Sequence, residues 1–138
     1  MSRASCGHVL VALVASSFLV ASCDTPFLPA PDITVTVTGA GDGDGNVFAP
    51  LTDVGIDCDI SGGATTGACM NIFEDNNAMG VFTLVATPEP GSVLDDFVVR
   101  CFDASPTCSI STTNGVATIT FDVDEDFDVT ARATFSLE

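Results

Sequence analysis

Oxygen-bearing side chains recur at every second position in one glycine-rich segment of this 138-residue chain. Asp42, Asp44 and Asn46 alternate with glycines, and Asp53 follows where the twelfth residue of a loop would stand. Calcium loops take ligands from alternate positions and a final carboxylate at the twelfth, so these four residues are candidate Ca²⁺ ligands. The sixth position, glycine in such loops, is Val47 in this chain. Because glycine and aspartate also make ordinary tight turns, a turn without metal is the favoured interpretation.

A second acidic cluster lies between residues 122 and 128. Five of its seven residues are carboxylates, namely Asp122, Asp124, Glu125, Asp126 and Asp128. Repulsion among these charges would attract a divalent cation or favour high salt. A solvated turn between two strands also explains the cluster and is the favoured interpretation.

The residue types that most catalysis needs are nearly absent. The one histidine is His8, and the chain has no lysine, tyrosine or tryptophan. Past the first residues the chain therefore offers no Ser-His-Asp, Cys-His or Ser-Lys arrangement. A carboxylate pair could still hydrolyse glycosides, but such sites usually stack sugars on aromatic rings that this chain lacks. A small carboxylate-based hydrolase is a remote alternative, and we expect no enzyme and no cofactor other than a possible Ca²⁺.

The first 22 residues have the pattern of a secretory signal. A basic start at Arg3 precedes an apolar stretch over 9–20, which is too short to span a bilayer as a stable helix. Residues 20–23, Val-Ala-Ser-Cys, resemble the lipobox of bacterial lipoproteins, in which the signal is cut before a cysteine that receives a diacylglycerol. The resemblance implies that Cys23 is lipidated and anchors the chain to a membrane. Cleavage by the general signal peptidase is the alternative, and residues 23–31, with three prolines, form a tether.

The expected export of the chain divides its six cysteines into three groups. Cys6 lies in the signal and Cys23 is the expected lipidation site, which leaves Cys58, Cys69, Cys101 and Cys108. An even number in an exported chain predicts disulfides. Of the three possible pairings we favour the sequence-near one, Cys58 with Cys69 and Cys101 with Cys108. A zinc site is the competing interpretation, but the chain has no C-x-x-C pair and no histidine beyond the signal.

Charge and composition limit the classes of partner. The formal net charge is -16, so nucleic acids and anionic lipid surfaces are repelled, and we expect no nucleic-acid partner. Hydrophobic residues make up 46% of the chain, which is enough for a packed core. The length then allows one domain over residues 32–138.

The remaining pattern is one of strands and turns. Residues 33–38 and 127–137 alternate apolar and polar side chains, which predicts half-buried strands. Residues 79–87 are apolar at nearly every position and predict a central strand covered on both faces. Glycines over 39–45 suggest a first hairpin, and Asn114-Gly115 predicts a second. The fold class is therefore all-β or mainly β, a small antiparallel module with little helix and two disulfides.

The order of these pieces resembles divergent internalin-type B-repeats, also called bacterial repeat domains. The matching segments are a threonine-valine strand and glycine turn over 34–47, a cysteine pair at 58 and 69, a strand over 82–88, a turn at 91–94, a cysteine pair at 101 and 108, and a last strand over 129–135. Phe97 stands where the family usually has tryptophan. The resemblance implies a β-grasp-like or sandwich-like module that serves as a spacer or binding unit and carries no active site.

These observations predict a non-catalytic β module on a bacterial lipoprotein. Its partners would be the membrane, through the lipid on Cys23, and an unidentified envelope protein. It would face the periplasm or the cell exterior. A calcium-responsive binding module is the alternative function.

Overall fold

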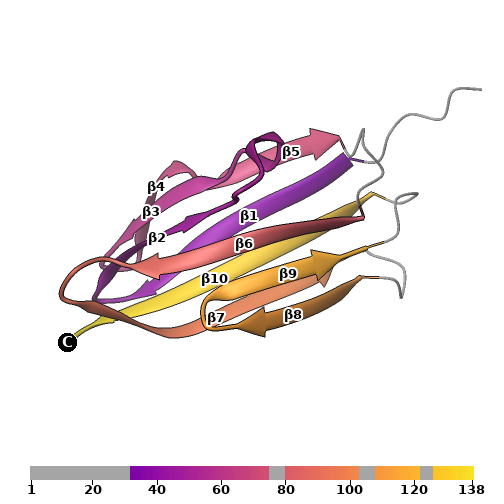
Figure 1. Cartoon of the computed structure of the whole chain (residues 1–138). Helices are drawn as coiled ribbons and strands as arrows, with labels where there is room; N and C mark the ends of the chain where they lie inside the picture. The colour runs from indigo at the N-terminus through magenta and orange to yellow at the C-terminus, as the bar shows by residue number, and fades with distance from the viewer. Residues whose placement is uncertain (1–31, 75–79, 103–107, 122–125) are drawn as a thin grey trace, which may run out of the picture.

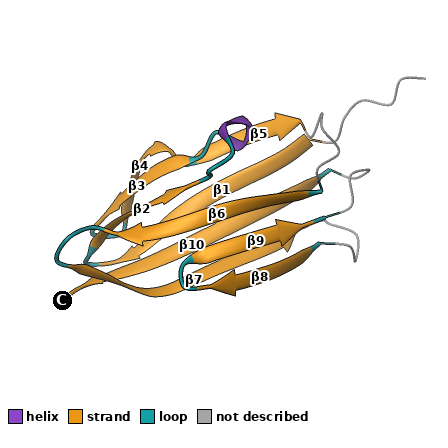
Figure 2. Ribbon diagram, in the orientation of Figure 1, coloured by secondary structure: helices purple, strands orange, loops and turns teal. Residues whose placement is uncertain are grey.

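The computed structural model describes residues 32–74, 80–102, 108–121 and 126–138, and strands account for most of them (Figure 2). The elements in chain order are β1 (Asp32–Gly41), β2 (Asp44–Phe48), a 3-10 helix (Thr52–Val54), β3 (Asp57–Ser61), β4 (Ala64–Ala68), β5 (Met70–Glu74), β6 (Val81–Pro88), β7 (Ser92–Phe102), β8 (Ser109–Thr113), β9 (Val116–Thr120) and β10 (Phe127–Leu137). The predicted all-β class is confirmed. No helix in the described ranges is long and apolar enough to cross a membrane.

The strands form two sheets that pack face to face as a sandwich (Figure 1). Sheet A has four strands in the order β5-β1-β10-β7, and sheet B has six in the order β4-β3-β2-β6-β9-β8. All pairings are antiparallel except that of β1 with β10, which run parallel in the middle of sheet A. Parallel neighbours cannot be joined by a tight turn and need a long connection. Here the chain from β2 to β9 forms the connection between β1 and β10.

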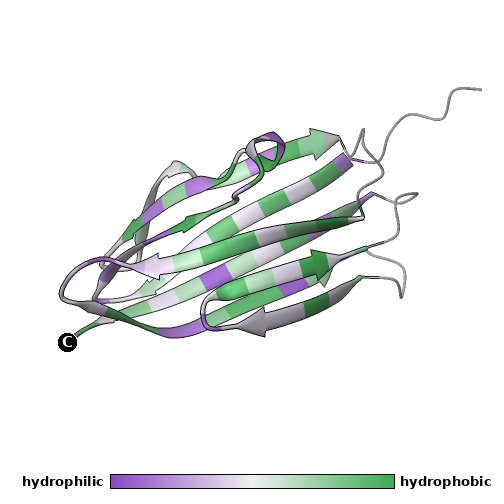
Figure 3. Ribbon diagram, viewed as in Figure 1, coloured by the Kyte–Doolittle hydropathy of each residue, from purple (hydrophilic) through white to green (hydrophobic). Residues whose placement is uncertain are grey.

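The core lies between the sheets and follows the alternation of the strands. On β10 every second side chain is buried, including Phe127, Val129 and Phe135, and Figure 3 shows the same alternation along β1. Sheet B contributes the opposite layer, with Val47, Leu84 and Ile119 among its fully buried side chains. A period of two places one set of side chains on each face, which is why these sequences form half-buried strands.

The expectation of a first hairpin over 33–48 is wrong. β1 belongs to sheet A and β2 to sheet B, so the glycine-rich segment carries the chain from one sheet to the other. At Gly43 the backbone passes so close to β10 that a Cβ would lie 2.6 Å from the Ser136 carbonyl carbon. Glycine has no Cβ and so permits this close approach. A composition that is typical of a tight reversal therefore forms a crossing between the two sheets in this chain.

Two further turn and strand predictions had different outcomes. The Asn114-Gly115 hairpin is confirmed, because it joins β8 to β9 with both residues at positive φ, 49° and 76°. The expectation that β6 is covered on both faces is wrong. Phe82 and Leu84 are buried, but Val81 on the other face is 39% exposed, because a two-layer sandwich covers only one face of each sheet.

Candidate functional site

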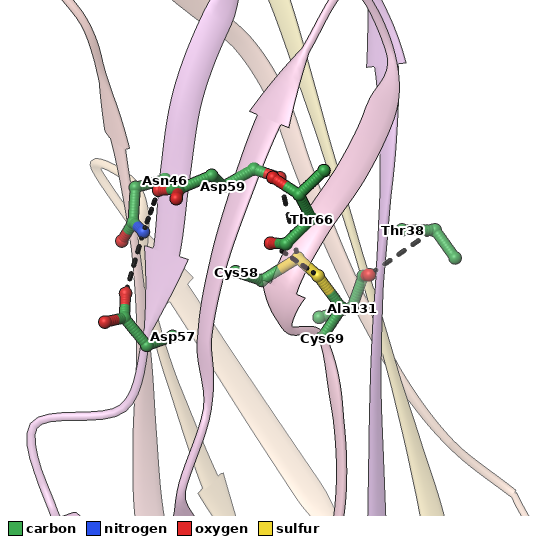
Figure 4. Close-up of a disulfide and its surroundings, with 8 residues drawn as sticks. All are labelled: Thr38, Asn46, Asp57, Cys58, Asp59, Thr66, Cys69 and Ala131. Carbon is green, nitrogen blue, oxygen red and sulfur yellow. Dashed lines mark hydrogen bonds between the residues drawn. A yellow bond between two sulfur atoms is a disulfide. The ribbon is translucent and has the colours of Figure 1, made fainter.

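Both predicted disulfides are present, and each lies where the chain passes between the sheets. Cys58 on β3 is fully buried in sheet B and bonds to Cys69, the residue between β4 of sheet B and β5 of sheet A (Figure 4). The backbone N–H of Val37 on β1 donates to the Cys69 carbonyl at 2.7 Å. This disulfide therefore holds the corner of the chain against a central strand of the opposite sheet.

The second disulfide has the same relation to the two sheets. Cys101 stands near the end of β7 in sheet A, and Cys108 immediately precedes β8 in sheet B, with Cα atoms 6.5 Å apart. Two crossings between the layers are thus closed by covalent bonds. In a sandwich of this size such cross-links reduce the freedom of the unfolded chain.

The four candidate calcium ligands are spread along β2 and beyond both of its ends. Asp42 lies in the crossing segment, where its Oδ1 accepts from the Leu137 N–H at 3.4 Å. Asp44 begins β2, Asn46 lies two residues on, and Asp53 belongs to the 3-10 helix beyond the end of that strand. Within the described residues no group of three His, Cys, Asp or Glu side chains could hold a metal ion. Calcium binding stays a prediction, which calorimetric titration of the oxidised protein with millimolar Ca²⁺ tests.

Asn46 has a different role, which its sequence position did not reveal. Its Nδ2 donates to Asp57 Oδ1 and to Asp59 Oδ1, both at 2.9 Å (Figure 4). The register of β2 with β3 sets Asn46 opposite Asp59, so the amide lies between two carboxylates of the neighbouring strand. An amide that donates to both relieves the repulsion of like charges on one face of a sheet.

Changing Asn46 to aspartate should therefore destabilise the protein more than changing it to alanine. Asn46→Ala loses two hydrogen bonds, and we expect a loss of about 1 kcal/mol in the free energy of unfolding. Asn46→Asp adds a third carboxylate to the pair, so its loss should be larger at low salt and should shrink in about 1 M NaCl as the charges are screened. Urea unfolding at both salt concentrations measures this. Equal losses for the two variants at low salt would contradict the assignment.

Part of the second acidic cluster lies outside the described residues, namely Asp122, Asp124 and Glu125. The two described members have different surroundings. Asp126 accepts through Oδ1 from the Asp32 N–H at 2.8 Å, at the start of β1, and Asp128 is exposed on the outer face of β10. Affinity of this cluster for a divalent cation therefore stays a prediction, as does the solvated turn.

Two arginines that the sequence presented only as charges lie together on the outer face of sheet A. Arg100 on β7 pairs with Thr130 on β10, and Arg132 pairs with Val98, so the arginines are diagonal neighbours across the two strands. Both line a groove of about 260 Å³, which we call the arginine groove and whose lining residues are Thr38, Val98, Arg100, Phe102, Thr130 and Arg132. No ion pair of either arginine is found in the described structure.

A larger hollow lies where β7 approaches the β8-β9 hairpin. It measures about 470 Å³, and its lining includes Leu94, Asp95, Asp96 and Asn114. The pairing of β7 with β10 shifts between Thr134 and Phe135, so Asp95 is the extra residue of a β-bulge and both aspartates are exposed. Its two carboxylates disfavour anions, which makes it chemically opposite to the arginine groove.

No family model, curated protein or solved structure matches the chain. The resemblance to internalin-type B-repeats therefore stays a prediction.

Proposed function

We propose that this chain is a membrane-anchored lipoprotein of a bacterial cell envelope. In this proposal residues 32–138 form a non-catalytic module that has a structural or protein-binding role. The observation that supports it best is the pair of disulfides, Cys58 with Cys69 and Cys101 with Cys108, at two crossings between the sheets. Disulfides form and persist in oxidising compartments, which fits a chain that leaves the cytosol.

The lipid anchor is argued from the segment that precedes the sandwich. The Cys23 thiol would carry the diacylglycerol, cleavage before Cys23 would free its amine for acylation, and residues 24–31 would link the lipid to β1. Burial of several acyl chains contributes about 0.8 kcal/mol per methylene, so the anchor would be stable. The remaining chain, with two arginines against nineteen acids, would then keep the module itself away from anionic headgroups.

The non-catalytic role is argued from the side chains available. Beyond Cys23 the sequence holds no histidine, lysine, tyrosine or tryptophan. Ser-His, Cys-His and Ser-Lys sites need a base that histidine or lysine supplies, which leaves only a pair of carboxylates as the remote catalytic alternative. The exposed faces of the two sheets offer area for contact with another protein, and contact of that kind needs no reactive group.

Blocking lipoprotein processing tests the anchor. With a globomycin-type inhibitor the protein should accumulate as an uncut precursor of lower gel mobility, and Cys23→Ser should abolish incorporation of labelled palmitate. Cys6→Ser is the matched control, because it removes a thiol from the signal and should leave labelling unchanged. An unshifted band under the inhibitor, or full labelling of the Cys23→Ser protein, would refute the lipoprotein proposal.

A further inference from the structure

The outer face of sheet A holds the only positive charges of residues 24–138. The sequence has three bases, Arg3, Arg100 and Arg132, against nineteen acids. Although acids outnumber them so heavily, Arg100 and Arg132 form no ion pair within the described residues and line the same groove. A strongly acidic chain thus presents two unpaired guanidinium groups at one place.

The neighbours of the two arginines confine the positive charge to that place. Along the β7-β10 pair the rows of the outer face contain, in order, Asp128, Arg100, Arg132 and Asp96, one charged residue in each row. A ligand with one anionic group can lie between the arginines. A polyanion lying along these strands would run over the aspartates, and like charges opposite one another are unfavourable.

The walls of the groove favour a carboxylate with apolar neighbours. Val98 and Phe102 lie beside the arginines, and Phe102 is 46% exposed. A guanidinium presents a rigid planar fork of donors that matches the two oxygens of a carboxylate. Apolar side chains at the same place can contact the groups that flank the acid in the ligand.

Exposed apolar side chains stand on both edge strands of sheet A, Phe102 on β7 and Met70 and Ile72 on β5, and the distance between these strands sets the size of the ligand. The register places Arg100, Thr130, Thr36 and Met70 in one row and Phe102, Asp128, Thr34 and Ile72 in the next. Met70 and Ile72, on the edge strand β5, are 64% and 58% exposed. Four adjacent strands span about 15 Å, which an extended peptide of about five residues covers and a free amino-acid-sized acid does not.

We propose that the outer face of sheet A is a docking site for a segment of a partner protein that carries one acidic side chain between apolar residues. The carboxylate binds between Arg100 and Arg132, and the flanking residues contact Phe102 on one side and Met70 and Ile72 on the other. This proposal rests on the protein-binding role proposed above and names the surface and the chemistry of that partner.

Binding to defined peptides tests the site on the full chain, extracted in mild detergent. The probes are two libraries of blocked peptides of about seven residues with Leu, Val, Phe, Thr or Ser at the outer positions, one with central glutamate and one with central glutamine. We expect the glutamate library to yield binders that the glutamine library lacks. For those binders Arg100→Gln and Arg132→Gln should each weaken affinity at least about tenfold.

Ser111→Glu is the matched control. Ser111 is exposed on β8 of sheet B, and the change lowers the net charge by one, as each arginine substitution does. It should leave the affinity within about twofold, because Ser111 belongs to the other sheet and an exposed charge outside the groove is screened by salt. Far-UV circular dichroism and thermal unfolding confirm that each variant is folded, and Arg132→Lys, which keeps the charge but loses the fork, should weaken binding by an intermediate factor.

Several outcomes would overturn the site. One is equal recovery of binders from the two libraries, and another is equal weakening of binding by Ser111→Glu and by the arginine variants. A third is that no peptide binds, whereas phosphatidylglycerol vesicles bind and the arginine variants abolish that binding. Palmitate labelling of Cys23, measured on the same preparation, separates failure of the site from failure of the proposed lipoprotein function.

Discussion

Replacing Phe135 by alanine is expected to lower the free energy of unfolding by about 3–5 kcal/mol. Phe135 is fully buried on the central strand β10 and is the largest of the fully buried side chains. Its ring lies against Gly45 of β2, in the opposite sheet, where an added Cβ would collide with the ring. Truncation would thus leave a cavity between the two layers at a point where they approach closely. Urea unfolding followed by circular dichroism measures the loss.

The pairing of Phe135 with Gly45 makes this prediction sharper. Gly45→Ala alone should cost about 1–3 kcal/mol, because it overpacks the same space. In a Phe135→Ala background the cost of Gly45→Ala should fall markedly, since the ring is gone and contacting residues are not additive. Leu137→Ala on the same strand is the control, because Leu137 is 61% exposed and should lose less than about 1 kcal/mol. Additive costs for the two core changes would show that the ring does not pack on Gly45.

Removing the Cys58–Cys69 disulfide, with both cysteines changed to alanine, should destabilise the protein by roughly 3 kcal/mol. The disulfide closes a loop with a sequence separation of 11 and fixes the corner that bonds to Val37 of the opposite sheet. A loss of this size is a large fraction of the net stability of a small domain, about 5–15 kcal/mol. Thermal unfolding with and without a reductant measures it, and the unmodified protein should respond more strongly to the reductant than the variant does.

The Cys101–Cys108 pair provides the comparison for that experiment. Its sequence separation is 7, so its removal should cost slightly less, roughly 2.5 kcal/mol. A double-alanine variant at Cys58 and Cys69 that unfolds at the temperature of the unmodified protein would contradict a stabilising role for the sheet-crossing disulfide.

The parts of the fold that the sequence predicts well are those specified by neighbouring residues. β10 alternates over eleven residues, from Phe127 to Leu137, and only a half-buried strand places that pattern on one face. Asn114-Gly115 needs positive φ at both residues, which is why it indicates a two-residue hairpin. The disulfide pairing follows from short loops in the same way.

The parts of the fold that the sequence does not predict depend on contacts between residues that are far apart along the chain. Glycines over 39–45 fit a reversal within one sheet and a crossing between two sheets equally well, and only the packing of Gly43 on β10 decides between them. β4 contains only small residues and threonines, all of them exposed, so no alternation of apolar and polar residues predicts a strand there. The apolar run of β6 predicts that both faces of the strand are covered. The number of layers that pack on a sheet, however, cannot be predicted from the sequence of one strand.

The same limit applies to the surfaces. The spacing of Asn46 suggests a calcium ligand, and its hydrogen bonds to Asp57 and Asp59 appear only once β2 pairs with β3. Arg100 and Arg132 are 32 positions apart in the sequence and become neighbours through the register of β7 with β10. A one-residue slip in that register would move one of them to the other face, so sequence periodicity alone could not bring them together.

Intact-mass spectrometry of the protein purified from its own cells under non-reducing conditions tests the central claim most directly. We expect the mass of residues 23–138 plus a diacylglyceryl group on the Cys23 thiol, with or without an acyl group on its amine, less four hydrogens for the two disulfides. A mass that corresponds to all 138 residues, unacylated and with every thiol reduced, would contradict the account of an exported and anchored module.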